Sequence, residues 1–290
     1  MKLGIFSHCV IDTIVLGNSS YEQMGGGACY GAYTAKNLKF DVVLHTKFGN
    51  DFPSNEYLSS KKIIFEKALS EKPTTKFTIK ISGSNKELYL TDKCDPLEYS
   101  DVPADGIIIS PVFDEVSFSM FEKIKKDSKF IFLDPQGFLR RINSEKKIYL
   151  ENTKIDLSNV KAIKVNPNEL FNLSESNGIE GMKNLQKRGI ENVLLTNKRE
   201  IMLLVKDKIY SIDLPNLDLF DTTGLGDIFC SSFCCTMLKE KDFFWALSFA
   251  GGAVQAAIES KEIGLKKVPS KGAIETNAAY FYNLIKFKQV

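Results

Sequence analysis

Histidine is nearly absent from this sequence: His8 and His45 are the only two among 290 residues. A histidine-based zinc site or a Ser-His-Asp triad therefore has little material. The six cysteines form no C-x-x-C pair, and four of them stand among apolar or small residues, as buried reduced thiols do. These scarcities argue against zinc chemistry and against hydrolysis by a histidine triad.

Uninterrupted apolar runs are also short, and none approaches the roughly 18 residues that a membrane span requires. The opening residues, M-K-L-G-I-F, are followed by His8 and Asp12, where a signal peptide needs its apolar core. The 38 basic and 36 acidic residues are spread along the chain and leave a net charge of +2, so no nucleic-acid-binding surface is indicated. We expect a cytoplasmic protein that acts on a small molecule, with no nucleic-acid or membrane partner.

What the sequence does contain is an alternation of apolar strands with amphipathic helices. Strands are predicted at residues 3–10, 41–46, 106–110, 130–134, 162–166 and 192–196. Helices are predicted at residues 28–37, 51–61, 116–126, 179–188, 227–238 and 243–259. This order predicts a mostly parallel sheet with helices on both faces, and a length of 290 residues suits one α/β domain over residues 1–290.

One segment breaks this rhythm. Residues 75–81 and 87–91 are two alternating runs around a glycine-containing turn, which is typical of a hairpin. Residues 13–16 could supply a further short strand for it to pair with. We therefore expect a small β lobe, built from about residues 13–24 and 73–98, that lies over the main domain as a lid.

The most informative string is D-T-T-G-L-G-D, residues 221–227, directly before a predicted buried helix. Gly224 and Gly226 can take positive φ and turn successive N–H groups, with that of Leu225 between them, toward one point at the helix start. Asp227 in the first helical turn could accept a hydroxyl proton during attack on a bound phosphoryl group. A plain glycine-rich turn with Asp227 as a helix cap is the alternative.

This string resembles the D-T-x-G-A-G-D signature of the ribokinase-like (PfkB) carbohydrate kinases, and it departs only in Leu225. The resemblance implies a ribokinase-like, doubly wound, mostly parallel α/β fold with a small β-sheet lid. It also implies ATP and Mg²⁺ as cofactors, Asp227 as catalytic base, and an anion hole at 224–226. Thr222 would contact the nucleotide and Asp221 the metal through water, and a homodimer through the lid is a further implication.

A second string, Asn166-Pro167-Asn168-Glu169, looks like the family's N-x-x-E motif, with Asn166 and Glu169 as its two defining residues. An amide and a carboxylate three residues apart at the end of a strand suit water-mediated contact to a phosphate-bound Mg²⁺, with Asn166 also near the nucleotide. A capping box at the start of a helix is the alternative interpretation, because it has the same residues at the same spacing.

The acceptor site is indicated by two further segments. Gly26 and Gly27 belong to a string, residues 25–32, that is similar to the family's di-glycine signature, and Tyr30 stands there where many members carry a substrate-binding Asn. Asp12 matches the family's substrate-gripping Asp, although an exposed Asp closing a strand is the simpler interpretation.

Residues 134–140, D-P-Q-G-F-L-R, together with Tyr30 look most like archaeal-type members that include inositol kinases. The resemblance makes Gln136 and Arg140 substrate-binding candidates, and a strand-to-loop turn is the alternative.

One departure affects the nucleotide contact. Family members carry T-x-G-x-x-G where this chain has Thr196-Asn197-Lys198-Arg199-Glu200, which contains no glycine. Thr196 and Lys198 remain nucleotide-binding candidates, and a solvated basic turn is equally consistent with the string.

The sequence therefore predicts an ATP-dependent kinase that phosphorylates a hydroxyl of a small sugar or cyclic polyol. A nucleoside kinase of the same family is the chemical alternative, since Tyr30 could stack on a base. A non-catalytic ligand-binding relative is the alternative from another class, although Asp227, Asn166 and Glu169 are all retained.

Overall fold

The computed structural model describes the whole chain except residues 84, 102 and 216–220. Its centre is a ten-stranded sheet whose strand order is β5-β4-β1-β8-β9-β12-β13-β14-β15-β16. The first seven run parallel: β5 (Ile64–Phe65), β4 (Asp41–His45), β1 (Lys2–Phe6), β8 (Gly106–Ile109), β9 (Ile131–Leu133), β12 (Ala162–Val165) and β13 (Asn192–Asn197). The predicted doubly wound, mostly parallel sheet is confirmed.

The strand order reverses beside β1, since β4 and β5 lie on one side of it and β8, β9, β12 and β13 on the other. The crevice at the carboxyl ends of the strands beside such a reversal is the usual ligand site of open α/β sheets. An antiparallel extension that the sequence analysis missed continues the sheet through β14 (Glu200–Val205), β15 (Lys208–Asp213) and β16 (Lys286–Gln289).

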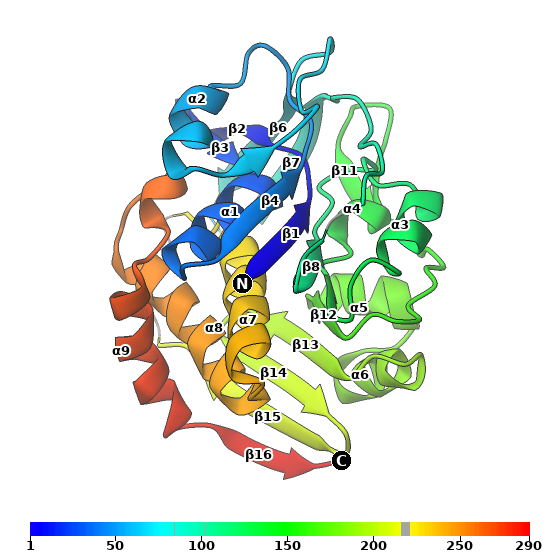
Figure 1. Cartoon of the computed structure of the whole chain (residues 1–290), viewed down its shortest axis with the longest axis vertical. Coiled ribbons are helices and arrows are strands. Elements are labelled where there is room, and N and C mark those ends of the chain that lie inside the picture. Colours follow the sequence, from blue (N-terminus) through cyan, green and yellow to red (C-terminus); the bar gives the residue numbers. More distant parts are fainter. Residues whose placement is uncertain (84, 102, 216–220) are drawn as a thin grey trace.

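Helices cover both faces of this sheet (Figure 1). One core contains side chains of α1 (Gly27–Asn37), α7 (Leu225–Glu240), α8 (Phe243–Glu259) and α9 (Lys271–Tyr282). A second core, on the other face, contains side chains of α3 (Phe118–Ile124), α5 (Pro167–Ser174) and α6 (Gly178–Lys187). None of the described helices has the length and apolar composition that crossing a membrane demands.

A separate four-stranded sheet, here called the small sheet, lies over one end of the main sheet (Figure 1). Its strands are β3 (Ser19–Gly25), β2 (Val10–Leu16), β6 (Thr75–Ser82) and β7 (Asn85–Asp92), in that order. It packs through its own apolar cluster, which includes Ile14, Phe77 and Ile79, on Val112 and Phe113 of the main domain. The predicted hairpin is thus present outside the central sheet, and Ser84 of its turn lies outside the described residues.

Two predicted elements differ from the structure. The strand expected at 3–10 ends at Phe6, because the chain turns there and re-enters a sheet as β2. The turn is stable because side chains satisfy its amides: Glu115 accepts from His8 N and Thr46 from Cys9 N. The helix expected at 51–61 is reduced to α2 (Ser54–Tyr57) and a 3₁₀ turn, η1 (Ser59–Lys61).

The remaining elements are short and follow the carboxyl end of β9 along the chain: α4 (Gln136–Leu139), β10 (Arg140–Ile142) and β11 (Ile148–Leu150). A second 3₁₀ turn, η2 (Gly264–Lys267), connects α8 to α9. All six cysteines are free and buried, as expected.

Candidate active site

Asp227 stands in the first turn of α7 and faces a cavity of about 200 Å³ between the main and small sheets. Its Oδ1 accepts a hydrogen bond of 3.2 Å from Ser110 Oγ, just beyond the end of β8. Asp227 is only partly buried by surface area because it opens onto this cavity. The cavity is nevertheless deep enough that desolvation, reinforced by Asp134, raises the pKa of Asp227 to about 7.

Gly224 and Gly226 play different parts beside it. Gly224 caps α7 with φ of +79°, so the predicted positive φ is found there. Gly226 lies within the helix and has no positive φ, so that part of the prediction is wrong. A β-carbon on Gly226 would meet Lys164 Nζ at 3.4 Å. Because Gly226 has no side chain, this part of the cavity stays open.

The amino end of α7 is the segment that the sequence predicts as an anion hole, and it is called the anion hole below. The main-chain N–H groups of Gly226 and Asp227 belong to the first turn, where a helix has no partner for them. Thr222, Thr223, Gly224 and Gly226 all line the cavity. Leu225 does not line it, because its side chain packs against the main core.

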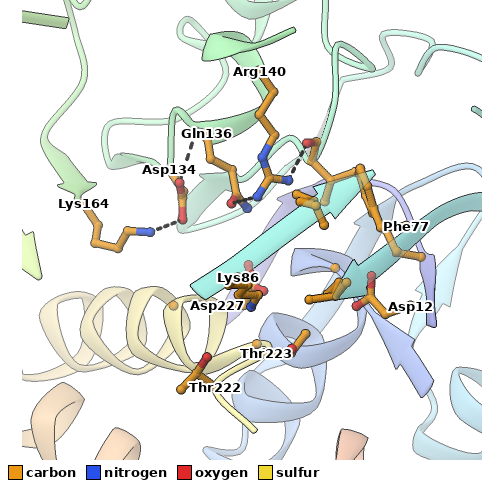
Figure 2. Close-up of a pocket in the computed structure, with 17 residues that line it drawn as sticks. Asp12, Phe77, Lys86, Asp134, Gln136, Arg140, Lys164, Thr222, Thr223 and Asp227 are labelled. Carbon is orange, nitrogen blue, oxygen red and sulfur yellow. Dashed lines mark hydrogen bonds and ion pairs between the residues drawn. The ribbon is translucent and has the colours of Figure 1, made fainter. Parts of the chain in front are cut away.

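Most predicted acceptor residues line this same cavity, as Figure 2 shows. The lining comprises Val10, Asp12, Gly26, Phe77, Ile79, Lys86, Leu88, Val112, Asp134, Gln136, Arg140, Lys164, Thr222, Thr223, Gly224, Gly226 and Asp227. Asp12 lies within β2 and is 4% exposed, so it is not the exposed strand-closing Asp of the simpler interpretation. Burial raises the pKa of Asp12 to about 7.

Arg140 and Gln136 form one unit on this wall. Arg140 Nη2 donates to Gln136 Oε1 at 2.8 Å, and Nη1 donates to the Val112 carbonyl at 2.8 Å. The guanidinium lies over the Phe77 ring, 5.6 Å from its centroid. This cation–π contact joins the main domain to the small sheet at the cavity.

Tyr30 is not among the side chains that line the cavity. It is fully buried beneath the anion hole, so close to Gly224 that a β-carbon there would meet its ring at 2.3 Å. Gly27 also lies outside the lining and packs directly against Ser110 and Asp227. These two residues therefore act from behind the cavity wall, where the sequence analysis expected substrate contacts.

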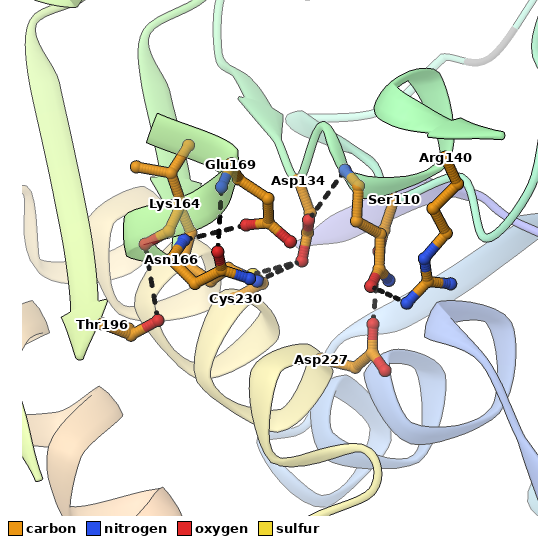
Figure 3. Close-up of polar contacts among 11 residues, drawn as sticks. Ser110, Asp134, Arg140, Lys164, Asn166, Glu169, Thr196, Asp227 and Cys230 are labelled. Atoms are coloured by element: carbon orange, nitrogen blue, oxygen red, sulfur yellow. Dashed lines mark hydrogen bonds and ion pairs between the residues drawn. The ribbon is translucent and has the colours of Figure 1, made fainter. Parts of the chain in front are cut away.

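A buried ion pair that the sequence analysis did not identify lies opposite Asp227 (Figure 3). Lys164 Nζ donates to Asp134 Oδ2 at 2.6 Å, and both side chains are nearly inaccessible to solvent. Gln136 N also donates to Asp134 Oδ1, at 3.3 Å. A lone lysine within the buried strand Ala-Ile-Lys-Val was the available signal, since an isolated charge there needs a partner.

Asn166 and Glu169 form a capping box at the start of α5. Asn166 Oδ1 accepts from Glu169 N at 2.9 Å, and Glu169 Oε2 accepts from Asn166 N at 2.8 Å (Figure 3). The capping interpretation of N-x-x-E is therefore realised. Glu169 is 4% exposed, and neither it nor Asn166 lines the cavity.

Asp221 is held by a protein cation. Lys267 Nζ lies 2.5 Å from Asp221 Oδ2, and both side chains are 1% exposed. Burial alone would raise the pKa of Asp221, but the hydrogen bond and charge of Lys267 outweigh it and the pKa lies below its ordinary value. Because this carboxylate is already neutralised, we do not retain Asp221 as a magnesium ligand.

Direct metal coordination finds little support in the rest of the site. Within residues 1–83, 85–101, 103–215 and 221–290, no three His, Cys, Asp or Glu side chains are grouped so that they could hold a metal ion.

Two of the residues expected at the nucleotide, Thr196 and Lys198, lie outside the cavity lining. Thr196 Oγ1 donates to the Val165 carbonyl at 3.5 Å. Lys198 has φ of +52° and is exposed in the two-residue turn between β13 and β14, and neither residue lines the cavity. The solvated-turn interpretation of Lys198 therefore matches its surroundings.

A scan against protein-family models and a search of curated proteins found no match. Solved structures, in contrast, resemble nearly the whole chain. A pyrophosphate-dependent kinase of the ribokinase family, complexed with a pyrophosphate analogue and myo-inositol, has a TM-score of 0.81 at 20% identity, with 94% of this chain and 99% of that chain covered.

Ribokinase from Arabidopsis thaliana, complexed with ribose and ATP, has a TM-score of 0.76 at 15% identity, covering 95% of this chain and 98% of the other. Nucleoside kinase from Methanocaldococcus jannaschii has a TM-score of 0.73 at 16% identity, covering 96% and 98%. At these identities the likeness is one of fold. The chain has the ribokinase-like fold that its motifs predicted.

Proposed function

We propose that this ribokinase-like chain is an ATP-dependent kinase that phosphorylates a hydroxyl of a small sugar or cyclic polyol. The observation that carries the proposal is the position of Asp227. Its carboxylate stands at the amino end of α7, beside unpaired first-turn amides, and faces the same cavity as Asp12 and Gln136. A proton acceptor, a phosphate cradle and hydroxyl-binding groups thus converge on one small space.

The chemistry follows from this convergence. The acceptor hydroxyl gives its proton to an Asp227 oxygen while its own oxygen attacks the terminal phosphorus of the donor. The bond between that phosphorus and the bridging oxygen breaks, and ADP leaves with the electron pair. The helix dipole and the amides near Gly224 and Gly226 stabilise the charge on the transferred group.

The walls of the cavity favour a small ring with both polar and apolar faces. Asp12, Gln136 and Arg140 offer acceptors and donors, while an apolar surface faces them from Val10, Phe77, Ile79, Leu88 and Val112. The volume of about 200 Å³ is below the roughly 300–1,000 Å³ of pockets for drug-sized ligands. Tyr30 is buried under Gly224 and is not available to stack on a base, so a sugar or polyol is favoured over a nucleoside.

Magnesium belongs to the donor in this proposal. Bound to the phosphates, Mg²⁺ would neutralise part of their charge, with Glu169 in contact through water. Lys164, aimed at the anion hole and held by Asp134, adds a fixed positive charge on the same side. Proton removal depends on Asp227 alone.

Inorganic pyrophosphate is the second candidate donor. The turn between β13 and β14 has two residues and no glycine, so the backbone approach to a nucleotide expected there is missing. One structurally similar kinase is pyrophosphate-dependent. Both donors present the same phosphoryl group to the anion hole, and only ATP needs a base pocket.

We further propose that the small sheet is a lid, because Arg140 and Phe77 join it to the main domain at the cavity edge. We place the protein in the cytoplasm, where six free buried thiols remain reduced.

The experiment that tests the proposal is a thermal-shift panel of sugars, polyols and nucleosides, with a non-hydrolysable ATP analogue or pyrophosphate. Stabilising pairs then enter a turnover assay with each donor. We expect a polyol or sugar to stabilise the protein further when a donor analogue is present, and to be phosphorylated. If ligands stabilise the protein but no ligand is phosphorylated with either donor, the result favours a non-catalytic ligand-binding protein. Turnover with nucleosides alone would favour a nucleoside kinase.

A further inference from the structure

Lys267 is a buried lysine that the proposed reaction does not use directly. It ends η2, far along the chain from the anion hole, and its side chain is 1% exposed. Its ammonium donates to Asp221 Oδ2 at 2.5 Å, to the Asp221 carbonyl at 3.0 Å and to the Thr223 carbonyl at 3.1 Å. The three N–H donors of an ammonium are thus matched by three oxygens of one short segment.

These oxygens belong to the segment that leads into the anion hole. Asp221 Oδ1 accepts from Thr223 N at 2.9 Å, so the carboxylate joins Lys267 to the turn as well. The next residue, Gly224, begins α7 with its positive φ. Burial lowers the pKa of Lys267, and its hydrogen bond with Asp221 opposes that shift.

The direction of these carbonyls decides where the neighbouring amides point. In a planar trans peptide, the C=O of one residue and the N–H of the next lie on opposite sides, and the described residues contain no cis peptide. The carbonyls of Asp221 and Thr223 turn toward Lys267. The N–H groups of Thr222 and Gly224 therefore turn away from it, and both residues line the cavity.

Tyr30 supports the same segment from beneath. Its ring packs against Gly224, and Lys267 Nζ lies 6.0 Å from the ring centroid. The loop is held between a fixed cation and a fixed ring, which leaves its amides little freedom.

We propose that Lys267 is a tethered cation that orients the anion-hole amides. It is a positioning residue, since it acts through Asp221, Thr223 and Gly224 and does not line the cavity. A consequence follows from the ligand set: with the lysine shortened, one carboxylate and two carbonyl oxygens are left facing a vacated space. Uncompensated buried oxygens of this kind suit a monovalent cation close in size to the lost ammonium group, so a Lys267→Ala chain should gain dependence on added K⁺ or NH₄⁺.

The test uses inorganic pyrophosphate as the anion probe and measures its affinity for the full chain by calorimetry, independently of turnover. In tetramethylammonium chloride, Lys267→Ala should bind pyrophosphate about ten- to a hundredfold more weakly than the wild type, the usual worth of charged hydrogen bonds. Potassium or ammonium chloride at the same ionic strength should restore most of that loss. The same salts should leave the wild type unchanged.

Lys125 provides the matched control. It is also a buried lysine, and it donates to a carbonyl and a carboxylate oxygen of one residue, Asp156, on the α3 side of the molecule. Lys125→Ala should lose thermal stability without losing pyrophosphate affinity and without any cation dependence. A Lys267→Met, Asp221→Asn chain removes both charges of the pair; it should remain folded, bind pyrophosphate weakly and show no rescue.

The outcomes separate this inference from the proposed function on which it partly rests. Equal pyrophosphate affinity in wild type and Lys267→Ala, or a loss that neither K⁺ nor NH₄⁺ reverses, overturns the role of Lys267 alone. A wild-type chain that binds no pyrophosphate overturns the inference about Lys267, while the kinase proposal is then decided by the turnover assay with ATP. If pyrophosphate binds but no acceptor is phosphorylated with any donor, the kinase proposal fails while the binding measurements still decide the role of Lys267.

Discussion

Gly27 and Asp227 lie in such close contact that a β-carbon on Gly27 would come within 3.1 Å of Asp227 Oδ1. The same atom would meet Ser110 Oγ at 2.8 Å. The proposed catalytic carboxylate is thus positioned partly by the missing side chain at the start of α1, and partly by the hydroxyl at the end of β8.

Gly27→Ala should therefore displace Asp227 and Ser110 without adding any atom to the cavity, because Gly27 does not line it. We expect kcat to fall by about 10- to 100-fold, since small misplacements of reacting groups cost that much, while KM for the acceptor changes little. Gly31→Ala in the same helix is the control, because its β-carbon would make only ordinary contacts, at 3.7 Å or more. Equal kinetics in the two variants would contradict the positioning role of Gly27.

Asp227→Asn should keep the helix start and its amides, because Asn is nearly isosteric with Asp. Calorimetric affinities for donor and acceptor should stay close to wild type, while kcat falls by about 10²–10⁴, the usual worth of a general base. Turnover near the wild-type value with binding intact would reduce Asp227 to a structural residue.

The raised pKa values of Asp12 and Asp227 predict a definite pH dependence. Each group has a pKa of about 7 when folded, against 3.8 ordinarily, so between these values the folded chain holds more protons than the unfolded chain. The free energy of unfolding should therefore fall as pH rises from about 4 to about 7 and show no further contribution from these groups above that. Turnover should rise with pH across 7 as Asp227 loses its proton.

Chemical denaturation at a series of pH values checks the stability part. Asp12→Asn and Asp227→Asn should each flatten the slope between pH 4 and 7, because neither amide titrates. A slope that is unchanged in both variants would assign the dependence to other groups.

Asp12→Ala should weaken acceptor binding. Removing a buried charged acceptor leaves substrate hydroxyls unpaired, a loss of about 1.5–3 kcal/mol that appears as a raised KM. Steady-state kinetics with every accepted substrate is the measurement, and the KM of the donor serves as the internal control. A KM for the acceptor that does not change would remove Asp12 from the site.

The two glycines of the anion hole should respond differently to alanine. Gly224→Ala introduces strain at φ of +79° and collides with Tyr30, so thermal stability and phosphate affinity should fall together. Gly226→Ala places a methyl group in the cavity, 3.4 Å from Lys164 Nζ, within a helix that tolerates alanine. It should keep stability and lose donor affinity, and a stability loss equal to that of Gly224→Ala would be the contrary result.

Contiguous features of the site could be predicted from the sequence, because glycines, a capping residue and a helix start act within one turn of chain. The glycine-rich start of α7, with Gly224 as its cap, and the capping box of Asn166 and Glu169 belong to this class. Asp12 and Gln136 were predicted as substrate-binding residues from the resemblance to the family's motifs, and both line one cavity in the structure.

Partners far apart in the chain could not be predicted in this way. Ser110 and Lys267 are ordinary residues in their local strings, and only the fold brings them to Asp227 and Asp221. Tyr30 was expected to contact the substrate because it follows the di-glycine string, but helix α1 turns it under Gly224 instead. Local sequence does not indicate whether a side chain will line the cavity or pack behind its lining.

The pairing of β2 with β6 has a consequence for the order in which the molecule assembles. These strands run parallel in the small sheet, and the chain between them forms β3, α1, β4, α2 and β5. Parallel pairing across such a long intervening segment costs loop-closure entropy that is recovered only after that segment is in place. The small sheet should thus complete late in folding and show weaker hydrogen-exchange protection than the ten-stranded sheet. If the small sheet opens at a low cost in free energy, it can admit a ligand to the cavity and close over it while the main domain stays folded.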